Sequence, residues 1–393
     1  MQVSTNRIIT THCGSLPRPE EIVEPLRAKD GGEPFDRVQL AARVRKSVAD
    51  VVAKQRELGI DVIDDGEHSK SSFSSYARGR IAGISPTEKT PDRHVEMTRD
   101  MLAFPEVYRE MRLMFGARPS AKIKARAMTP LACTGPIKYT GHAEVQEDID
   151  NLRAALANAP ETEGFITAIS PTNLEMYFPN QYYASDEEYL AALADALNEE
   201  YRAIVDAGFL VQLDDPRLIT HYNRSPNLTV EENRKFIAVR VEAINHSLRG
   251  IPEEKVRFHT CYSVNVAPRV HDLELRHYVD LMLKINAQGY SFEGANPRHE
   301  HEWEVWKEVK LPAHKLLLPG VVSHCVYQVE HPELVAQRIE RFASVAGREN
   351  VLASNDCGFA TSAASDQVHA DVAWAKLAAL SEGARIASKR LWG

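Results

Sequence analysis

A histidine, a glutamate and two cysteines in the last part of the chain could together bind a metal ion. Cys261 stands two residues after His259, a spacing that places both side chains on the same side of a strand. Glu293 and Cys357 follow further along the chain. One imidazole, one carboxylate and two thiolates form a plausible ligand set for Zn²⁺, which favours nitrogen and sulfur donors. The alternative for each cysteine alone is a small core residue.

The spacing of these residues is that of successive βα units, which take about 30 residues each. Glu293 comes one such interval after His259, and Cys357 comes two intervals after Glu293. His324 fits the same rhythm, because it divides the stretch from Glu293 to Cys357 into two nearly equal parts. We therefore expect each of them at the end of a successive strand. Because histidine titrates near neutrality, His324 could protonate a leaving group, and a surface or supporting histidine is the alternative.

The elements that must position these residues are short apolar runs alternating with helical stretches. Nine runs end in polar residues: 8–11, 60–63, 131–134, 165–169, 209–213, 256–258, 290–292, 316–322 and 351–353. Amphipathic helices are expected between them over 38–58, 186–207, 230–248 and 332–346. This alternation indicates parallel strands.

A single (β/α)₈ barrel, an α/β fold spanning one domain over residues 1–393, gathers such strand ends on one face, where active sites form. An open doubly wound sheet is the rival architecture. Nine runs for eight strands mean that one run is misassigned or lies outside the barrel. Residues 70–124 interrupt the rhythm, and we expect an inserted loop or helical segment there.

Three more polar residues should face the same opening, namely Ser15, Glu67 and Asp214. Helix capping or loop salt bridges would explain them without any ligand. Acidic groups at a barrel mouth could instead bind the ammonium group of an amino-acid substrate.

Composition limits the classes of protein that fit. The 393 residues carry 47 Lys and Arg against 55 Asp and Glu, a net charge of −8 that disfavours a nucleic-acid partner. No run approaches the length of a membrane span, and the N-terminus lacks the apolar core of a secretory signal. The five cysteines do not form a disulfide pattern, so their thiols stay reduced. Cys13, Cys133 and Cys325 should remain free, that is, none of them should be a principal metal ligand. We expect a cytoplasmic protein, and a homo-oligomer stays open.

A series of short motifs resembles the catalytic C-terminal barrel of the cobalamin-independent methionine synthases. They are Gly14-Ser15-Leu16-Pro17, Asp65-Gly66-Glu67, Gln212-Leu213-Asp214-Asp215-Pro216, His259-Thr260-Cys261-Tyr262, Phe292-Glu293, Pro319-Gly320-Val321 and Asp356-Cys357-Gly358. They cover almost the whole chain in the order of the family. The resemblance implies a barrel enzyme, a zinc-dependent methyltransferase, that transfers a methyl group from a folate or another donor to homocysteine.

The same resemblance implies roles for individual residues. His259, Cys261, Glu293 and Cys357 would bind zinc, while Ser15, Glu67 and Asp214 would hold the amino-acid part of homocysteine. Tyr177 stands where the family has a tryptophan that stacks on the pterin, and Ser323 precedes His324 where many short relatives have aspartate. Both differences from the family concern the part of the site that would bind the methyl donor.

Two other functions are consistent with the residues. Epoxyalkane–coenzyme M transferases of the same superfamily use zinc and a thiol to open an epoxide, and Arg78, Arg80 or Arg298 could bind their sulfonate. A purely structural zinc site is the non-enzymatic alternative, because four protein ligands are typical of structural zinc.

Overall fold

Eight parallel strands form the centre of the computed structural model, which describes residues 1–88, 97–116, 130–263, 267–363 and 368–393. Their order around the barrel is β1, β10, β9, β8, β7, β6, β5 and β2. The bounds are β1 Ile9–Thr10, β2 Val62–Ile63, β5 Glu163–Ile169, β6 Leu210–Asp214, β7 Val256–His259, β8 Gly289–Phe292, β9 Leu316–Val322 and β10 Leu352–Asn355. Between β1 and β2 the Asp61 amide donates to the Thr10 carbonyl at 3.1 Å, so the barrel is nearly closed. The predicted (β/α)₈ barrel is confirmed.

The ninth apolar run lies outside the barrel, as one of the nine had to. It forms the start of β4 (Leu131–Tyr139), which pairs antiparallel with β3 (Ile81–Pro86) in a separate two-stranded sheet. Both strands belong to the excursion that follows β2, together with the helices α3 (Arg99–Ala103) and α4 (Pro105–Gly116). The inserted segment expected over 70–124 is therefore present and continues into β4, although residues 89–96 and 117–129 lie outside the described residues.

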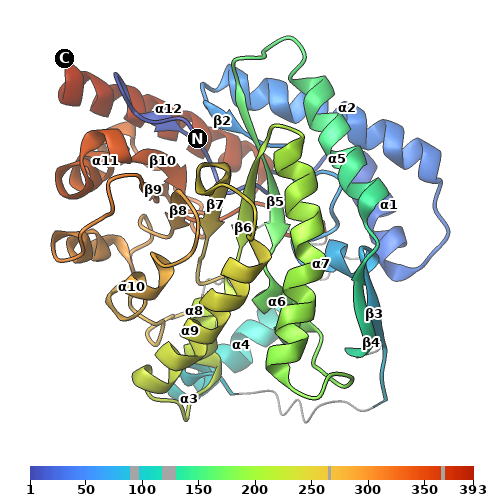
Figure 1. The fold of residues 1–393 in the computed structure, drawn as a ribbon. Helices are drawn as coiled ribbons and strands as arrows, with labels where there is room; N and C mark the ends of the chain where they lie inside the picture. The colour runs from blue at the N-terminus through green and yellow to red at the C-terminus, as the bar shows by residue number, and fades with distance from the viewer. Residues whose placement is uncertain (89–96, 117–129, 264–266, 364–367) are drawn as a thin grey trace.

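Helices surround the strands (Figure 1). The four predicted helices are α2 Arg37–Glu57, α7 Asp186–Asp206, α9 Val230–Ser247 and α11 Pro332–Ala346. The other α-helices are α1 Glu20–Gly31, α5 His142–Ala155, α6 Pro171–Tyr177, α8 Arg217–Arg224, α10 Val279–Met282 and α12 Ala370–Trp392. Short 3₁₀ helices span Ser75–Gly79, Glu253–Lys255, Leu275–His277, Glu300–Lys307 and Arg348–Asn350. In the described part of the chain, none of the helices combines the length and apolar character that crossing a bilayer requires.

The barrel interior changes from apolar to polar along the strands. One end is filled by a cluster of Ile9, Val62, Phe165, Leu210, Leu316, Leu318 and Leu352. Because side chains alternate along a strand, residues two and four positions further point into the same interior. In β6 these are Gln212 and Asp214, and in β7 Arg257 is followed by His259. The alternation thus delivers polar side chains to the carboxyl end of the barrel.

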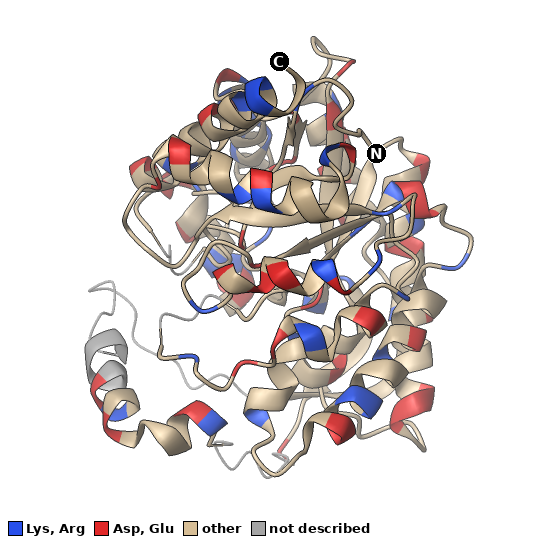
Figure 2. Cartoon of the chain, turned by 90° about the vertical axis from the view of Figure 1, so that its left-hand side faces the viewer, with Lys and Arg blue, Asp and Glu red and all other residues tan. Residues whose placement is uncertain are grey.

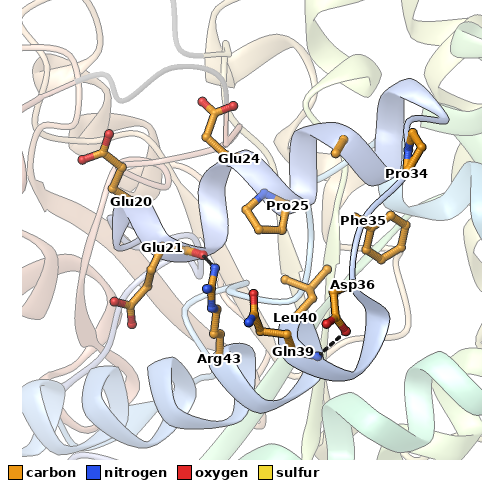
Figure 3. A pocket seen from close by; sticks show the side chains of 11 residues that line it. Glu20, Glu21, Glu24, Pro25, Pro34, Phe35, Asp36, Gln39, Leu40 and Arg43 are labelled. Atoms are coloured by element: carbon orange, nitrogen blue, oxygen red, sulfur yellow. Dashed lines mark hydrogen bonds between the residues drawn. The ribbon is translucent and has the colours of Figure 1, made fainter.

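Figure 3 shows a cleft on the outer surface, between α1 and the start of α2. Its volume is about 410 Å³, and residues of both helices line it. Pro25 inside α1 has no N–H to donate to the carbonyl of Glu21, and an Arg43 guanidinium N–H donates to that oxygen at 3.0 Å instead. None of the predicted site residues is among the described residues that line this cleft.

Figure 2 shows acidic and basic residues interspersed along the helices of one face.

Candidate active site

Three soft metal-binding donors meet at the carboxyl end of the barrel. Ligand atoms of His259, Cys261 and Cys357 all lie within 4.8 Å of one another, and the three side chains are buried. The two Sγ atoms are 3.2 Å apart. His259 Nδ1 is 3.1 Å from the hydroxyl of Ser291, while its buried Nε2 has no hydrogen-bond partner within the described ranges. A hydrogen bond that fixes one ring nitrogen and leaves the other free is the usual arrangement of a metal-binding histidine.

Of the three side chains in this cluster, Cys261 is the one whose pKa is shifted toward the form that binds metal, because a metal-binding cysteine is deprotonated and a metal-binding histidine is neutral. The hydrogen bond with Cys357 and the neighbouring His259 hold the pKa of Cys261 well below its usual range, although burial opposes this. Burial would lower the pKa of His259, but the thiols of Cys13 and Cys261 raise it well above its ordinary value. Cysteine binds metal as the thiolate, which the lowered pKa of Cys261 favours, whereas the hydrogen bond with Cys261 and burial raise the pKa of Cys357.

Glu293, predicted as the fourth ligand, is not in this cluster. Its Oε1 accepts a hydrogen bond from the Tyr262 amide at 2.7 Å, and its Oε2 pairs with Arg269 at 2.9 Å. Asn296 also donates to Oε2. Burial raises the pKa of Glu293 to about 7 against the influence of Arg269. The Glu293 carboxylate therefore makes its hydrogen bonds to residues outside the His–Cys–Cys cluster.

The pocket beside the cluster contains the three residues predicted to hold an amino acid. Ser15, Glu67 and Asp214 line it together with His259, Cys261 and Cys357. Ser15 lies against Gly358, where a Cβ atom would overlap the Ser15 hydroxyl, so this position needs glycine.

Glu67 is held in an unusual backbone conformation. Its φ of 58° is in the left-handed region, which non-glycine residues seldom adopt. The Arg18 guanidinium donates to its carbonyl from Nε at 3.2 Å and from Nη2 at 2.8 Å. Its Oε1 accepts from Thr167 at 2.9 Å, whereas the buried Oε2 accepts no hydrogen bond from the described residues. Arg18 Nη2 lies 3.9 Å from Oε2, beyond hydrogen-bond distance. A buried carboxylate oxygen that lacks a hydrogen bond at a pocket wall is a natural partner for a cationic ligand group.

Asp214 is the second carboxylate of the pocket. Its Oδ1 accepts from the Gln212 side chain at 2.9 Å. Burial raises its pKa to about 7, with Glu67 adding to the effect and His259 opposing it. Two neighbouring buried carboxylates of this kind are stabilised by a bound cation.

His324 and Tyr177 do not line the pocket among the described residues. His324 is fully buried, its Nε2 is 2.9 Å from the thiol of Cys325, and burial lowers its pKa to about 3, with Arg269 adding to the effect. Tyr177 ends α6, where its ring lies 6.3 Å from that of Phe73 and under the Arg217 guanidinium at 4.9 Å. Their assigned roles stay predictions.

Other residues of the pocket were not predicted from the sequence. They are Cys13, Phe73, Pro216, Ser263, Gly358 and Thr361. Phe73 interrupts the serine-rich stretch after β2, and an aromatic residue in such a polar stretch was the one available signal. Cys13 was expected only to be free; its Sγ lies 3.2 Å from Ser291 Oγ and 2.9 Å from the Asn355 carbonyl. All five cysteines are free of disulfides.

A parallel barrel whose mouth combines a His–Cys–Cys cluster with two buried carboxylates is a (β/α)₈ enzyme with a candidate metal centre. Comparison with known protein families identifies the family of this enzyme. Residues 8–160 and 163–380 match the catalytic domain of the cobalamin-independent synthases, and the chain belongs to this family.

Individual relatives agree over nearly the whole chain. A methionine synthase of Thermococcus kodakarensis is 24% identical over 385 residues, covering 97% of this chain and 94% of its own. One from Pyrococcus furiosus is 25% identical over 350 residues, covering 89% and 85%. The solved structure of a B12-independent methionine synthase from Shewanella sp. W3-18-1 in complex with selenomethionine has a TM-score of 0.72 at 19% identity, covering 98% of this chain and 99% of that one. This likeness shows the same fold.

Proposed function

We propose that the protein is a zinc-dependent methyltransferase that methylates the sulfur of homocysteine. The observation that carries the proposal is the buried Oε2 of Glu67, which accepts no hydrogen bond from the described residues and lies beside Asp214 in the same pocket as His259, Cys261 and Cys357. The pocket thus offers negative charge for an ammonium group and soft donors beside the place of a thiol. The methionine synthases among the relatives support this substrate.

His259, Cys261 and Cys357 would hold the zinc, and they fit it. The set combines an imidazole nitrogen that is left free for a ligand with two adjacent sulfurs, donors that zinc prefers. When bound, zinc favours the thiolate form of a substrate thiol at neutral pH, which makes the sulfur nucleophilic. Glu293 is proposed as the fourth ligand, and its carboxylate, which now accepts hydrogen bonds from Arg269 and Tyr262, keeps lone pairs for a metal.

Glu67 and Asp214 orient the substrate by binding its ammonium group, and Ser15 is proposed to bind its carboxylate. The aromatic pair Phe73 and Tyr177 is proposed as a wall for the methyl donor. His324 is proposed to return a proton to the spent donor. Because burial lowers the pKa of His324 to about 3, its ring is neutral at pH 7 and would first have to take up a proton, which the homocysteine thiol releases when it becomes a thiolate.

A coenzyme-M-type acceptor suits the pocket less well. The described residues that line the pocket include two carboxylates and no lysine or arginine. Arg80, one of the candidate sulfonate partners, is buried in an ion pair with Asp148 at 2.5 Å, and Arg298 donates to the Val270 carbonyl at 2.8 Å. A structural zinc site is also disfavoured, since the cluster borders a pocket.

Mass spectrometry of reaction products tests the proposal. Zinc-loaded protein is incubated with homocysteine and a panel of methyl donors, and separately with coenzyme M and a short epoxide. We expect methionine from at least one donor and no product from the epoxide mixture. Epoxide opening without any methionine would refute the assignment. His259→Ala, matched with the surface variant His142→Ala, links the product to the cluster.

A further inference from the structure

Lys70 is buried close behind the carboxylate wall of the pocket. It is 1% exposed, and its Nζ donates to the Thr167 carbonyl at 2.5 Å and to the Thr167 hydroxyl at 2.9 Å. The ring of Tyr76 lies 4.7 Å from the same nitrogen. Lys70 does not line the pocket among the described residues, so a substrate bound there would meet Glu67 rather than the lysine.

The direction of the hydrogen bonds follows from the chemistry of the groups. An ammonium group has only donors, so the Thr167 hydroxyl must accept from Lys70. The single proton of that hydroxyl is then directed to Glu67 Oε1, 2.9 Å away. Reversal would require the hydroxyl proton to face the ammonium. Lys70 therefore fixes the orientation of the Thr167 hydroxyl, and this hydroxyl holds Oε1 of Glu67 by a hydrogen bond.

We propose that Lys70 and Thr167 are positioning residues for substrate recognition, which anchor Glu67 Oε1 so that Oε2 is left without a hydrogen bond from the described residues and can accept one from the ammonium group of an amino-acid thiol. The Arg18 guanidinium does not take that place, because its Nη2 lies 3.9 Å from Oε2. This inference rests on the proposed function. Beyond that function, it explains how Glu67 at one wall of the pocket would select a thiol that carries an amino group.

Packing fixes the same side chains independently. A Cβ atom on Gly14 would lie 2.6 Å from Thr167 Cγ2 and 3.1 Å from Glu67 Oε1, so glycine at position 14 allows the threonine methyl and the carboxylate to come close. The threonine methyl faces Gly14, and its hydroxyl is left for Lys70 and Glu67. On the other side, Arg18 holds the strained Glu67 backbone.

A purely structural role for Lys70 is the competing explanation. Its charge lowers the pKa values of the buried carboxyl groups of Asp65, Asp148 and Asp214, so its removal would disturb the fold as well as the pocket. Thr167→Val avoids this difficulty. Valine keeps the volume and the methyl group that faces Gly14, leaves the carbonyl for Lys70, and removes only the hydroxyl between Lys70 and Glu67.

The test measures binding of two thiols to the zinc-loaded protein by isothermal titration calorimetry. One is homocysteine, and the other is 4-mercaptobutanoate, which has the same chain without the amino group. Thr167→Val is compared with Thr167→Ser, which restores the hydroxyl, and with Thr10→Val, which removes a buried hydroxyl bonded to Gly59. Lys70→Met is included, with its circular dichroism and melting temperature as a check of folding.

We expect Thr167→Val to weaken homocysteine binding about tenfold or more and to change 4-mercaptobutanoate binding by less than about twofold. Thr167→Ser and Thr10→Val should both bind homocysteine like the wild type, and a folded Lys70→Met should resemble Thr167→Val. Equal loss for both thiols, or no loss for either, would overturn the positioning role. If the wild type itself did not prefer homocysteine, the proposed function would fail instead.

Discussion

Replacing Asp214 by asparagine removes one negative charge from the pocket and leaves its shape. Asparagine keeps an oxygen that can accept from Gln212, as Asp214 Oδ1 does at 2.9 Å. The substrate ammonium loses a charged hydrogen bond, which typically costs about 1.5–3 kcal/mol. We therefore expect homocysteine to bind roughly ten- to 150-fold more weakly.

The pH dependence gives the prediction a sign. Burial raises the pKa of Asp214 to about 7, so its carboxyl group becomes neutral as the pH falls below that value. Wild-type affinity for homocysteine should decline from pH 8 to pH 6 more steeply than affinity for 4-mercaptobutanoate. The second thiol corrects for ionisation of the sulfur. The Asp214→Asn variant should lose the extra slope.

The same substitution that weakens homocysteine binding should make the unliganded protein more stable toward unfolding. A carboxyl group whose folded pKa is raised contributes stability below its unfolded pKa and loses it as the pH rises through the folded value. The free energy of unfolding of Asp214→Asn, measured in urea without ligand, should therefore exceed that of the wild type by an amount that grows as the pH rises from about 4 to about 7 and is constant above pH 7. Unchanged homocysteine affinity together with an unchanged pH slope would refute the role of Asp214.

Further variants test other parts of the site and fold. Cys357→Ser should lower bound zinc, measured by plasma mass spectrometry, while leaving the melting curve cooperative, because the large apolar core does not depend on the metal; loss of the fold would favour a structural metal site. His324→Gln should slow methyl transfer by about a hundredfold or more with homocysteine affinity unchanged, and equal rates would remove the histidine from the reaction. Arg43→Met should lower the free energy of unfolding by roughly 0.5–1.5 kcal/mol because the Glu21 carbonyl in α1 loses its partner, a loss that Pro25→Ala should largely restore in the double variant.

The barrel could be predicted because its signals are local and repeat. Each βα unit shows its own apolar run and amphipathic helix, so the bounds of α7, α9 and α11 differ from the predicted ones by at most one residue. The odd run at 131–134 could not be placed. Its antiparallel partner β3 lies far back in the chain, and this pairing leaves no mark on a strand that is as apolar as those of the barrel.

The site was predictable where residues sit at strand ends. His259, Cys261, Asp214 and Cys357 meet because their strands are parallel and their alternation points inward. Contacts that loops make, and contacts of residues lying behind the pocket wall, could not be predicted from the sequence. The pairing of Glu293 with Arg269 depends on how the segment after β7 folds back, and the contact of Lys70 with Thr167 joins residues 97 positions apart.

A crystal structure of the zinc-loaded protein with homocysteine tests the central claim most directly. The account predicts zinc bound by His259, Cys261 and Cys357, the substrate sulfur beside it, and the substrate nitrogen about 2.7–3.2 Å from Glu67 Oε2 and from the Asp214 carboxylate. A homocysteine whose amino group faces away from both carboxylates, or a zinc ion held elsewhere, would contradict it.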